Sequence, residues 1–110
     1  MVVRSKLTHR ELYAMLAYDP DTGAFVWRER KDKSARWNAR FANRPVDLHY
    51  APLDYVLLSI DGHKYPAEEV AFCLMTGAWS KRGVTHRSSD ICDNRWSNLR
   101  ELAPNPYRSK

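Results

Sequence analysis

The sequence predicts a small α+β domain, in which helices and antiparallel strands form separate parts of the chain. Three observations indicate this class: a helix-capping pattern before an apolar helical face, an Asp-Gly dipeptide inside an alternating strand pattern, and a later apolar run of helical length. A length of 110 residues suits one domain with one modest core, and we find no internal repeat.

The first expected helix begins at Thr8, because Thr8 and Glu11 have the spacing of a capping box. Apolar side chains in the segment 12–16 lie at the spacing of one helical face. Asp19-Pro20-Asp21-Thr22-Gly23 then predicts a turn, since proline fixes φ and glycine permits positive φ. The segment 24–27 is typical of a short strand.

The segment 28–44 contains seven basic and two acidic residues, and the formal net charge of the whole chain is +5. Its apolar periodicity is poor, so we expect a long solvated loop. Trp37 and Phe41 within it either stack on nucleic-acid bases or pin the loop to the core, and pinning is the favoured alternative. Excess positive charge favours a nucleic-acid partner, although many proteins with a few excess lysines bind none. The candidate phosphate contacts are Arg28, Arg30, Lys31, Lys33, Arg36, Arg40 and Arg44.

The segment 54–65 predicts a β-hairpin, because apolar and more polar residues alternate and Asp61-Gly62 suits a type I′ turn. Pro66 ends the second strand, and a helix is expected from about Ala67 until Gly77. This helix is apolar nearly all round, which indicates burial.

A final helix is expected near the C-terminal end of the sequence. Asp93 or Asn94 can cap it, and Trp96 and Leu99 lie on it at helical spacing.

Two cysteines, Cys73 and Cys92, are 19 positions apart and form no CxxC pair, so neither a zinc clamp nor a disulfide framework is indicated. Residues 1–7 lack the apolar core of a signal peptide, and no apolar run approaches the roughly 18 residues of a membrane span. We therefore expect a cytoplasmic protein without a membrane partner.

Two segments resemble phage-type HNH endonucleases. The run Val70-Ala71-Phe72-Cys73-Leu74-Met75-Thr76-Gly77 resembles that family's apolar helix ending in M-T-G, and Asp93-Asn94-Arg95-Trp96-Ser97-Asn98-Leu99-Arg100-Glu101 resembles its D-N-R-W-S-N-L-R motif. The turn and hairpin described above also resemble the family, so the resemblance spans about Leu12 to Glu101. It implies one HNH-like domain over 1–110. Residues 67–110 would hold a helix and a ββα-metal core, preceded by the helix, basic loop and hairpin of residues 1–66.

The resemblance implies a role for three residues. In this family a histidine on the first strand acts as general base toward water, and a divalent metal such as Mg²⁺ neutralises the scissile phosphate. By motif position His86 is the base, Asn98 is the asparagine that holds the hairpin, and Asn94 ties the loop to the following helix. Double-stranded DNA is the implied partner, and further phosphate contacts would be Lys81, Arg82, Arg87, Arg95 and Arg100.

Two metal-ligand positions depart from the family pattern. Thr85 stands where the family has a ligating aspartate, and Tyr107 falls on the last motif position, which is normally histidine or asparagine. A hydroxyl and a phenol are neutral and weak ligands for a hard cation, so no metal cofactor is expected unless Asp90 or Asp93 substitutes. His86 is then either a hydrogen-bonding strut or a residual catalytic base.

Glu68 and Glu69 occupy the place of a histidine-arginine pair in the family. Acidic residues suit the first turn of a helix through its dipole, or they mark an edge that no longer faces phosphate.

Three functions follow, and the sequence leaves open whether the chain is an enzyme. The first is an HNH-like DNA-binding protein whose phosphodiester cleavage is impaired or lost. The second is an active metal-dependent endonuclease with His86 as base. The third is a phage-derived interaction protein that inhibits a host nucleic-acid-processing or defence complex through Glu68, Glu69 and Trp37.

Overall fold

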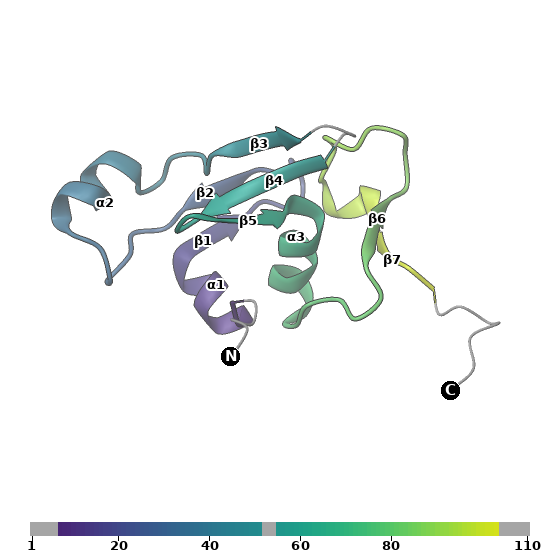
Figure 1. Ribbon diagram of the computed structural model, residues 1–110, viewed down its shortest axis with the longest axis horizontal. Helices are drawn as coiled ribbons and strands as arrows, with labels where there is room; N and C mark the ends of the chain where they lie inside the picture. Colours follow the sequence, from purple (N-terminus) through teal and green to yellow (C-terminus); the bar gives the residue numbers. More distant parts are fainter. Residues whose placement is uncertain (1–6, 52–54, 104–110) are drawn as a thin grey trace.

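The computed structural model describes residues 7–51 and 55–103, and within these ranges the chain has the expected α+β architecture (Figure 1). Its strands pair antiparallel in a β1–β2 hairpin, a three-stranded β3–β4–β5 sheet and a β6–β7 hairpin. The helices are α1 (His9–Met15), α2 (Ala35–Phe41) and α3 (Ala67–Thr76), with a 3-10 turn, η1 (Trp96–Asn98). The strands are β1 (Leu16–Tyr18), β2 (Phe25–Trp27), β3 (Leu48–Ala51), β4 (Tyr55–Ile60), β5 (His63–Pro66), β6 (Val84–His86) and β7 (Leu99–Glu101).

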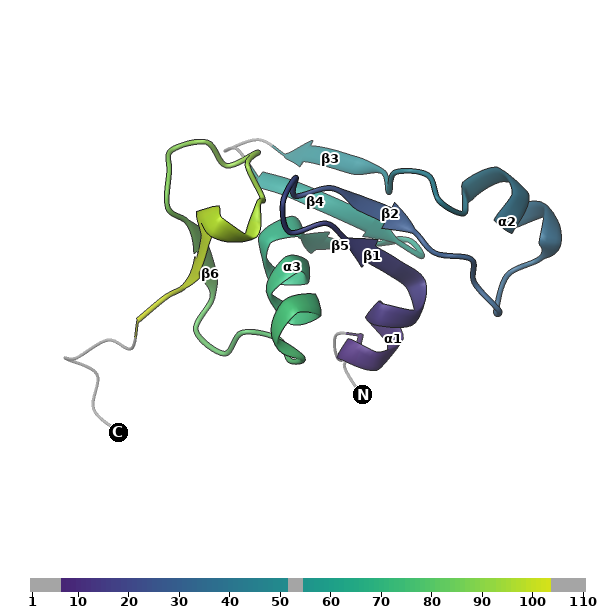
Figure 2. The same cartoon turned by 180° about the vertical axis from the view of Figure 1, so that it is seen from behind.

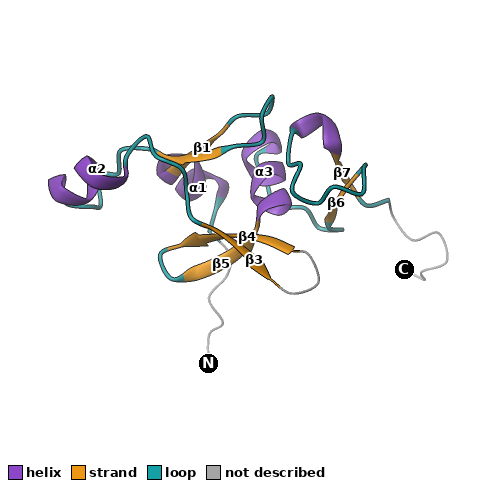
Figure 3. Ribbon diagram, turned by 90° about the horizontal axis from the view of Figure 1, so that it is seen from above, coloured by secondary structure: helices purple, strands orange, loops and turns teal. Residues whose placement is uncertain are grey.

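The core lies between α1, α3 and the three-stranded sheet. Figure 3 shows both helices on the same side of that sheet. Val56, Leu58 and Ile60 of β4 are buried, as their alternation predicts. Asp61 and Gly62 both have positive φ, as a type I′ turn requires, so the predicted hairpin is confirmed. One apolar cluster runs from Leu7 to Leu99 and therefore includes residues of both halves of the chain.

The N-terminal helix begins with the predicted capping box: Thr8 Oγ1 accepts from the Glu11 amide, and the Glu11 carboxylate accepts from the Thr8 amide. The helix ends one residue earlier than its apolar face suggests, because Leu16 begins β1 and pairs with Trp27 of β2. The predicted turn at 19–23 joins these two strands.

The prediction of a solvated loop over 28–44 is wrong, because α2 forms inside it. Ser34 caps α2 by accepting a hydrogen bond from the Trp37 amide at 3.0 Å. Trp37 and Phe41, one helical turn apart, face inward and their ring centroids lie 5.1 Å apart. The Trp37 ring also meets Trp27 of β2 edge-on, so Trp37 pins the segment to the core, as favoured above.

The predicted final helix from residue 93 or 94 is also wrong. Residues 96–98 form a single 3-10 turn, and Leu99 then enters β7, which pairs with β6. Pairing with β6 buries Leu99 and satisfies backbone groups that an isolated short helix would leave open. Any helix after β7 falls on residues 104–110, outside the described residues.

Helix α3 has the predicted bounds, and Gly77 ends it with a left-handed φ of 95°. Its inner face is fully buried, whereas Met75 is exposed, so burial is one-sided rather than complete. None of the helices in the described ranges is long and apolar enough to cross a membrane.

Candidate functional site

His86 lies at the end of β6, opposite Leu99 of β7, and the loop between the two strands folds back over it. Its Nε2 atom is 2.7 Å from Oδ1 of Asn94, a residue that is only 5% exposed. A carboxamide oxygen only accepts, so Nε2 donates to it, and in the neutral imidazole Nδ1 then keeps its lone pair. Asn94 thus holds the histidine directly, whereas the resemblance implied that Asn94 ties the loop to the following helix.

Asn98 holds the two ends of the same loop together. Its Oδ1 accepts from the Ser88 amide at 3.0 Å, and its Nδ2 donates to the Asp93 carbonyl at 2.8 Å. Its own carbonyl accepts from the Arg87 amide at 2.7 Å. Asn98 is buried, and its hydrogen bonds fix the loop beside His86. The expected hairpin-holding role agrees with these contacts, but Asn98 lies in η1 and not at the start of a helix.

The turn between β1 and β2 contacts this loop from the other side. The Tyr18 hydroxyl donates to the Asn94 carbonyl, and the Trp96 amide donates to the Pro20 carbonyl at 2.9 Å. Burial, together with the charges of two nearby aspartates, raises the pKa of Tyr18 to about 12, so the hydroxyl stays protonated as a donor. A Cβ atom on Gly23 would lie 2.7 Å from the Asn94 carbonyl carbon, which explains a glycine there.

Sequence reasoning missed this contact, because a turn motif does not indicate which distant loop it will contact. The only available signal was that the turn and the 93–101 motif occur together in the same family.

The acidic residues near His86 do not form a ligand set for a divalent ion. Asp93 accepts two hydrogen bonds from the Arg95 side chain, at 2.8 and 2.7 Å, and these lower the pKa of Asp93 to about 2. Asp90 is exposed, and its Oδ1 accepts from the Cys92 amide. Among the described residues, no group of three histidine, cysteine, aspartate or glutamate side chains lies close enough to hold a metal ion. Tyr107 lies outside the described residues.

Glu68, in the first turn of α3, is the one further carboxylate whose pKa responds to His86. Burial raises the pKa of Glu68, and the charge of His86 opposes that rise. Glu68, Glu69 and Trp37 are each partly buried.

Arg30 is not a DNA contact, and that prediction is wrong. It is 2% exposed, its guanidinium carbon lies 5.5 and 5.3 Å from the centroids of the Trp27 and Trp37 rings, and it donates to the carboxylates of both Asp32 and Asp61. These partners raise its pKa further above its usual range, so it is a charged anchor and not a phosphate ligand.

The other predicted basic residues fall into two groups. Arg28 and Lys33 are partly engaged, since Arg28 Nε donates to the Leu16 carbonyl and Lys33 pairs with Asp61 at 3.5 Å. The exposed ones are Lys31, Arg36, Arg40 and Arg44 around α2, and Lys81, Arg82, Arg87, Arg95 and Arg100 around β6 and β7; of these, Arg95 also pairs with Asp93. Figures 1 and 2 show α2 and the β6–β7 hairpin at opposite ends of the molecule, whose longest extent is 52 Å.

Comparisons with protein-family models, with curated proteins and with solved structures find no match. The resemblance to HNH endonucleases therefore depends on the motif residues of the sequence alone.

Proposed function

We propose that this chain is a DNA-binding protein built on an HNH-like hairpin, with phosphodiester cleavage impaired or lost. The observation that carries the proposal is the hydrogen bond from His86 Nε2 to Asn94 Oδ1, within a loop that Asn98 closes. Both asparagines occupy the motif positions at which the family places them. The tautomer that Asn94 selects leaves Nδ1 of His86 able to accept a proton from water.

Loss of cleavage is supported by the side chains around His86. Thr85 precedes the histidine on β6 with a neutral hydroxyl, and the nearest aspartate, Asp93, already accepts two hydrogen bonds from Arg95. Hard divalent ions need several anionic or carbonyl oxygens, and this donor set does not fit one. We therefore derive no catalytic step through a metal.

DNA binding is supported by nine exposed basic residues in two groups at the two ends of the molecule. Since about 3.4 Å of duplex corresponds to one base pair, a molecule of this length could follow a duplex of roughly 15 base pairs. Lysine and arginine contacts with phosphate release counterions, so the predicted binding is largely independent of sequence and depends steeply on salt.

Fluorescence anisotropy with a labelled 20-base-pair duplex, measured between about 50 and 300 mM salt, tests this proposal. We expect affinity to fall steeply with salt in the wild-type protein. The combined variant Arg36→Ala, Arg40→Ala and Arg44→Ala should reduce the slope of log K against log salt by up to about 2.7, or 0.9 for each lost phosphate contact. The matched control is Arg10→Ala with Lys64→Ala, two exposed basic residues outside both groups. Absent or salt-insensitive binding would remove DNA from the proposed function.

A residual endonuclease activity is the second candidate, and the orientation of His86 favours it. Relaxation of supercoiled plasmid in Mg²⁺, Mn²⁺ or Ni²⁺ is the direct assay. Activity that His86→Ala abolishes would establish an enzyme, whereas intact plasmid with both proteins in every metal would rule out cleavage under these conditions.

A further inference from the structure

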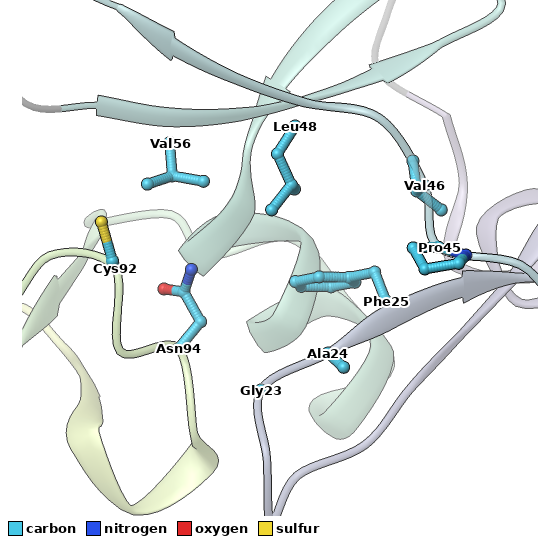
Figure 4. Close-up of a pocket in the computed structure, with 9 residues that line it drawn as sticks. All are labelled: Gly23, Ala24, Phe25, Pro45, Val46, Leu48, Val56, Cys92 and Asn94. Atoms are coloured by element: carbon cyan, nitrogen blue, oxygen red, sulfur yellow. The ribbon is translucent and has the colours of Figure 1, made fainter.

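A small cavity lies beside the loop that holds His86, between that loop and the strands β2, β3 and β4 (Figure 4). Its volume is about 140 Å³. The walls are mainly apolar and include Phe25, Val46, Leu48 and Val56. An apolar cavity of roughly 150 Å³ accepts a benzene ring, so this one has room for one small ring.

Asn94 supplies a polar group to this otherwise apolar cavity. Its oxygen is occupied by His86, and Figure 4 shows its nitrogen on the side of the cavity that Val56 and Leu48 line. In the described part of the chain, Nδ2 of Asn94 has no hydrogen-bond acceptor. The described residues leave no buried side-chain nitrogen without a partner, so Nδ2 of Asn94 faces solvent in the cavity and can donate to an incoming acceptor.

We infer that this cavity receives a single nucleobase turned out of a DNA strand, with Asn94 Nδ2 donating to a carbonyl oxygen or ring nitrogen of the base edge. This inference rests on the proposed DNA-binding function and names a further contact of the same site. Enzymes and other proteins that accept an extruded base enclose it between aromatic or apolar side chains and contact its polar edge by hydrogen bonds. Phe25, Val46 and Val56 would provide the apolar enclosure, and Asn94 would provide the hydrogen bond to the polar edge.

The charge around the cavity favours a nucleotide over a purely apolar ligand. Arg44 directly precedes the lining residue Pro45, and Arg95 directly follows Asn94; both residues are exposed, and Arg95 also pairs with Asp93. The phosphates on either side of an extruded base would therefore meet cationic side chains. The cavity is also reachable from solvent, since Leu48 is 44% exposed and Cys92 is exposed.

An occupied cavity would act on His86 through Asn94. A base that accepts from Nδ2 fixes the carboxamide, and the same carboxamide holds Nε2 of the histidine. Nucleotide binding and the orientation of His86 are then coupled through one side chain.

The first experiment uses a duplex with one 2-aminopurine beside the thymine or cytosine to be extruded, because the fluorescence of 2-aminopurine is quenched by stacking and rises when the neighbouring base leaves the stack. Binding is followed separately by the anisotropy of a terminal label. We expect emission to rise when wild-type protein binds. Asn94→Asp keeps an acceptor for His86 but removes the donor, and it should abolish most of that rise.

A variant that fills the cavity tests whether its apolar walls take part in binding the base. Ala24 is an exposed lining residue, so Ala24→Leu can obstruct the cavity from its rim with little risk to folding. Ala14→Leu, at an exposed position on α1, is the matched control. Ala24→Leu should suppress the rise in emission while anisotropy still reports binding, and Ala14→Leu should leave both unchanged.

The second experiment does not depend on DNA binding. Thymidine and cytidine are titrated at millimolar concentration while NMR signals of the Asn94 side-chain amide and the Val46 and Val56 methyl groups are followed. Shifts that saturate, with affinity about fivefold lower in Asn94→Asp, would support the base site.

The outcomes separate the two proposals. Duplex binding without a rise in emission and without nucleoside shifts would overturn the base site and leave the proposed function standing. If no duplex binds, the proposed function fails and the nucleoside titration alone decides about the cavity. Equal shifts with benzene, unaffected by Asn94→Asp, would show a merely apolar cavity and overturn the inference.

Discussion

The guanidinium of Arg30 donates to both carboxylate oxygens of Asp61, at 3.0 and 2.9 Å, across 31 positions of the chain. This contact ties the segment before α2 to the turn between β4 and β5. The same guanidinium also donates to Asp32 and lies 5.3 Å from the centroid of the Trp37 ring. The basic segment thus contains a structural anchor, and its exposed arginines, Arg36, Arg40 and Arg44, follow Arg30 in the sequence.

Replacing Arg30 by alanine should lower the free energy of unfolding by about 2–3 kcal/mol. Asp32 and Asp61 can be rehydrated, because their side chains are 61% and 41% exposed. Most of the loss therefore comes from the packing of Arg30 against the Trp27 and Trp37 rings. Urea unfolding followed by tryptophan fluorescence measures the change. Arg36→Ala, which removes an exposed arginine from α2, is the control and should change stability by no more than about 0.5 kcal/mol. Equal stability of both variants would contradict the anchoring role.

The same ion pairs predict a dependence of stability on acid. Hydrogen bonds from Arg30 lower the pKa of Asp32 and of Asp61 in the folded chain. Their contribution is therefore fully present above the unfolded pKa near 3.9 and is lost as pH falls through the folded pKa values. The effect should be small, because both carboxylates are largely screened by solvent.

Urea midpoints between about pH 6 and pH 3 should fall less steeply in Arg30→Ala than in the wild-type protein. Arg36→Ala again serves as the control and should follow the wild-type curve. Parallel curves for Arg30→Ala and the wild type would mean that the ion pairs of Arg30 with these two carboxylates do not stabilise the folded chain.

Alanine substitutions at Gly23 and Gly62 separate the cost of a steric clash from the cost of a positive φ. Both have a positive φ, 81° and 84°, but a Cβ at Gly23 meets the backbone of Asn94 and Arg95, whereas a Cβ at Gly62 has no atom within 4 Å. Gly62→Ala should cost about 1 kcal/mol, from φ alone. Gly23→Ala should lower the free energy of unfolding by roughly 2–4 kcal/mol, because the contact between this turn and the His86 loop must also open.

Thermal unfolding measures these stabilities, and the NMR signals of the His86 ring report the loop. We expect those signals to change in Gly23→Ala and to stay as in the wild type in Gly62→Ala. A small and equal cost at both glycines would show that the turn does not support the loop.

Thr85→Asp restores a carboxylate directly before His86 on β6. If the hairpin is intact and lacks only an anionic ligand, this variant should bind Mg²⁺ or Mn²⁺ measurably in calorimetry, whereas the wild type should not. Thr85→Asn is the matched control, since it has nearly the same shape without the charge. Wild-type binding as tight as that of Thr85→Asp would show that the chain already holds a sufficient ligand set.

The sequence by itself determined the elements whose signals are local. The capping box of Thr8 and Glu11, the Asp61-Gly62 turn and the Gly77 helix end each depend on residues within a few positions, and each forms as expected. The sequence also singled out His86 and Asn94 as site residues, but it did not predict the hydrogen bond between them.

Tertiary structure alone decided the features that depend on distant partners. Arg30 reads as a surface arginine until Asp61 and two tryptophans surround it, and α2 becomes stable because Trp37 packs on Trp27. Leu99 has helical spacing from Trp96, yet it forms a strand because β6 offers unpaired backbone groups beside it. In each case the free energy comes from contacts between segments far apart in sequence, and no local pattern records them.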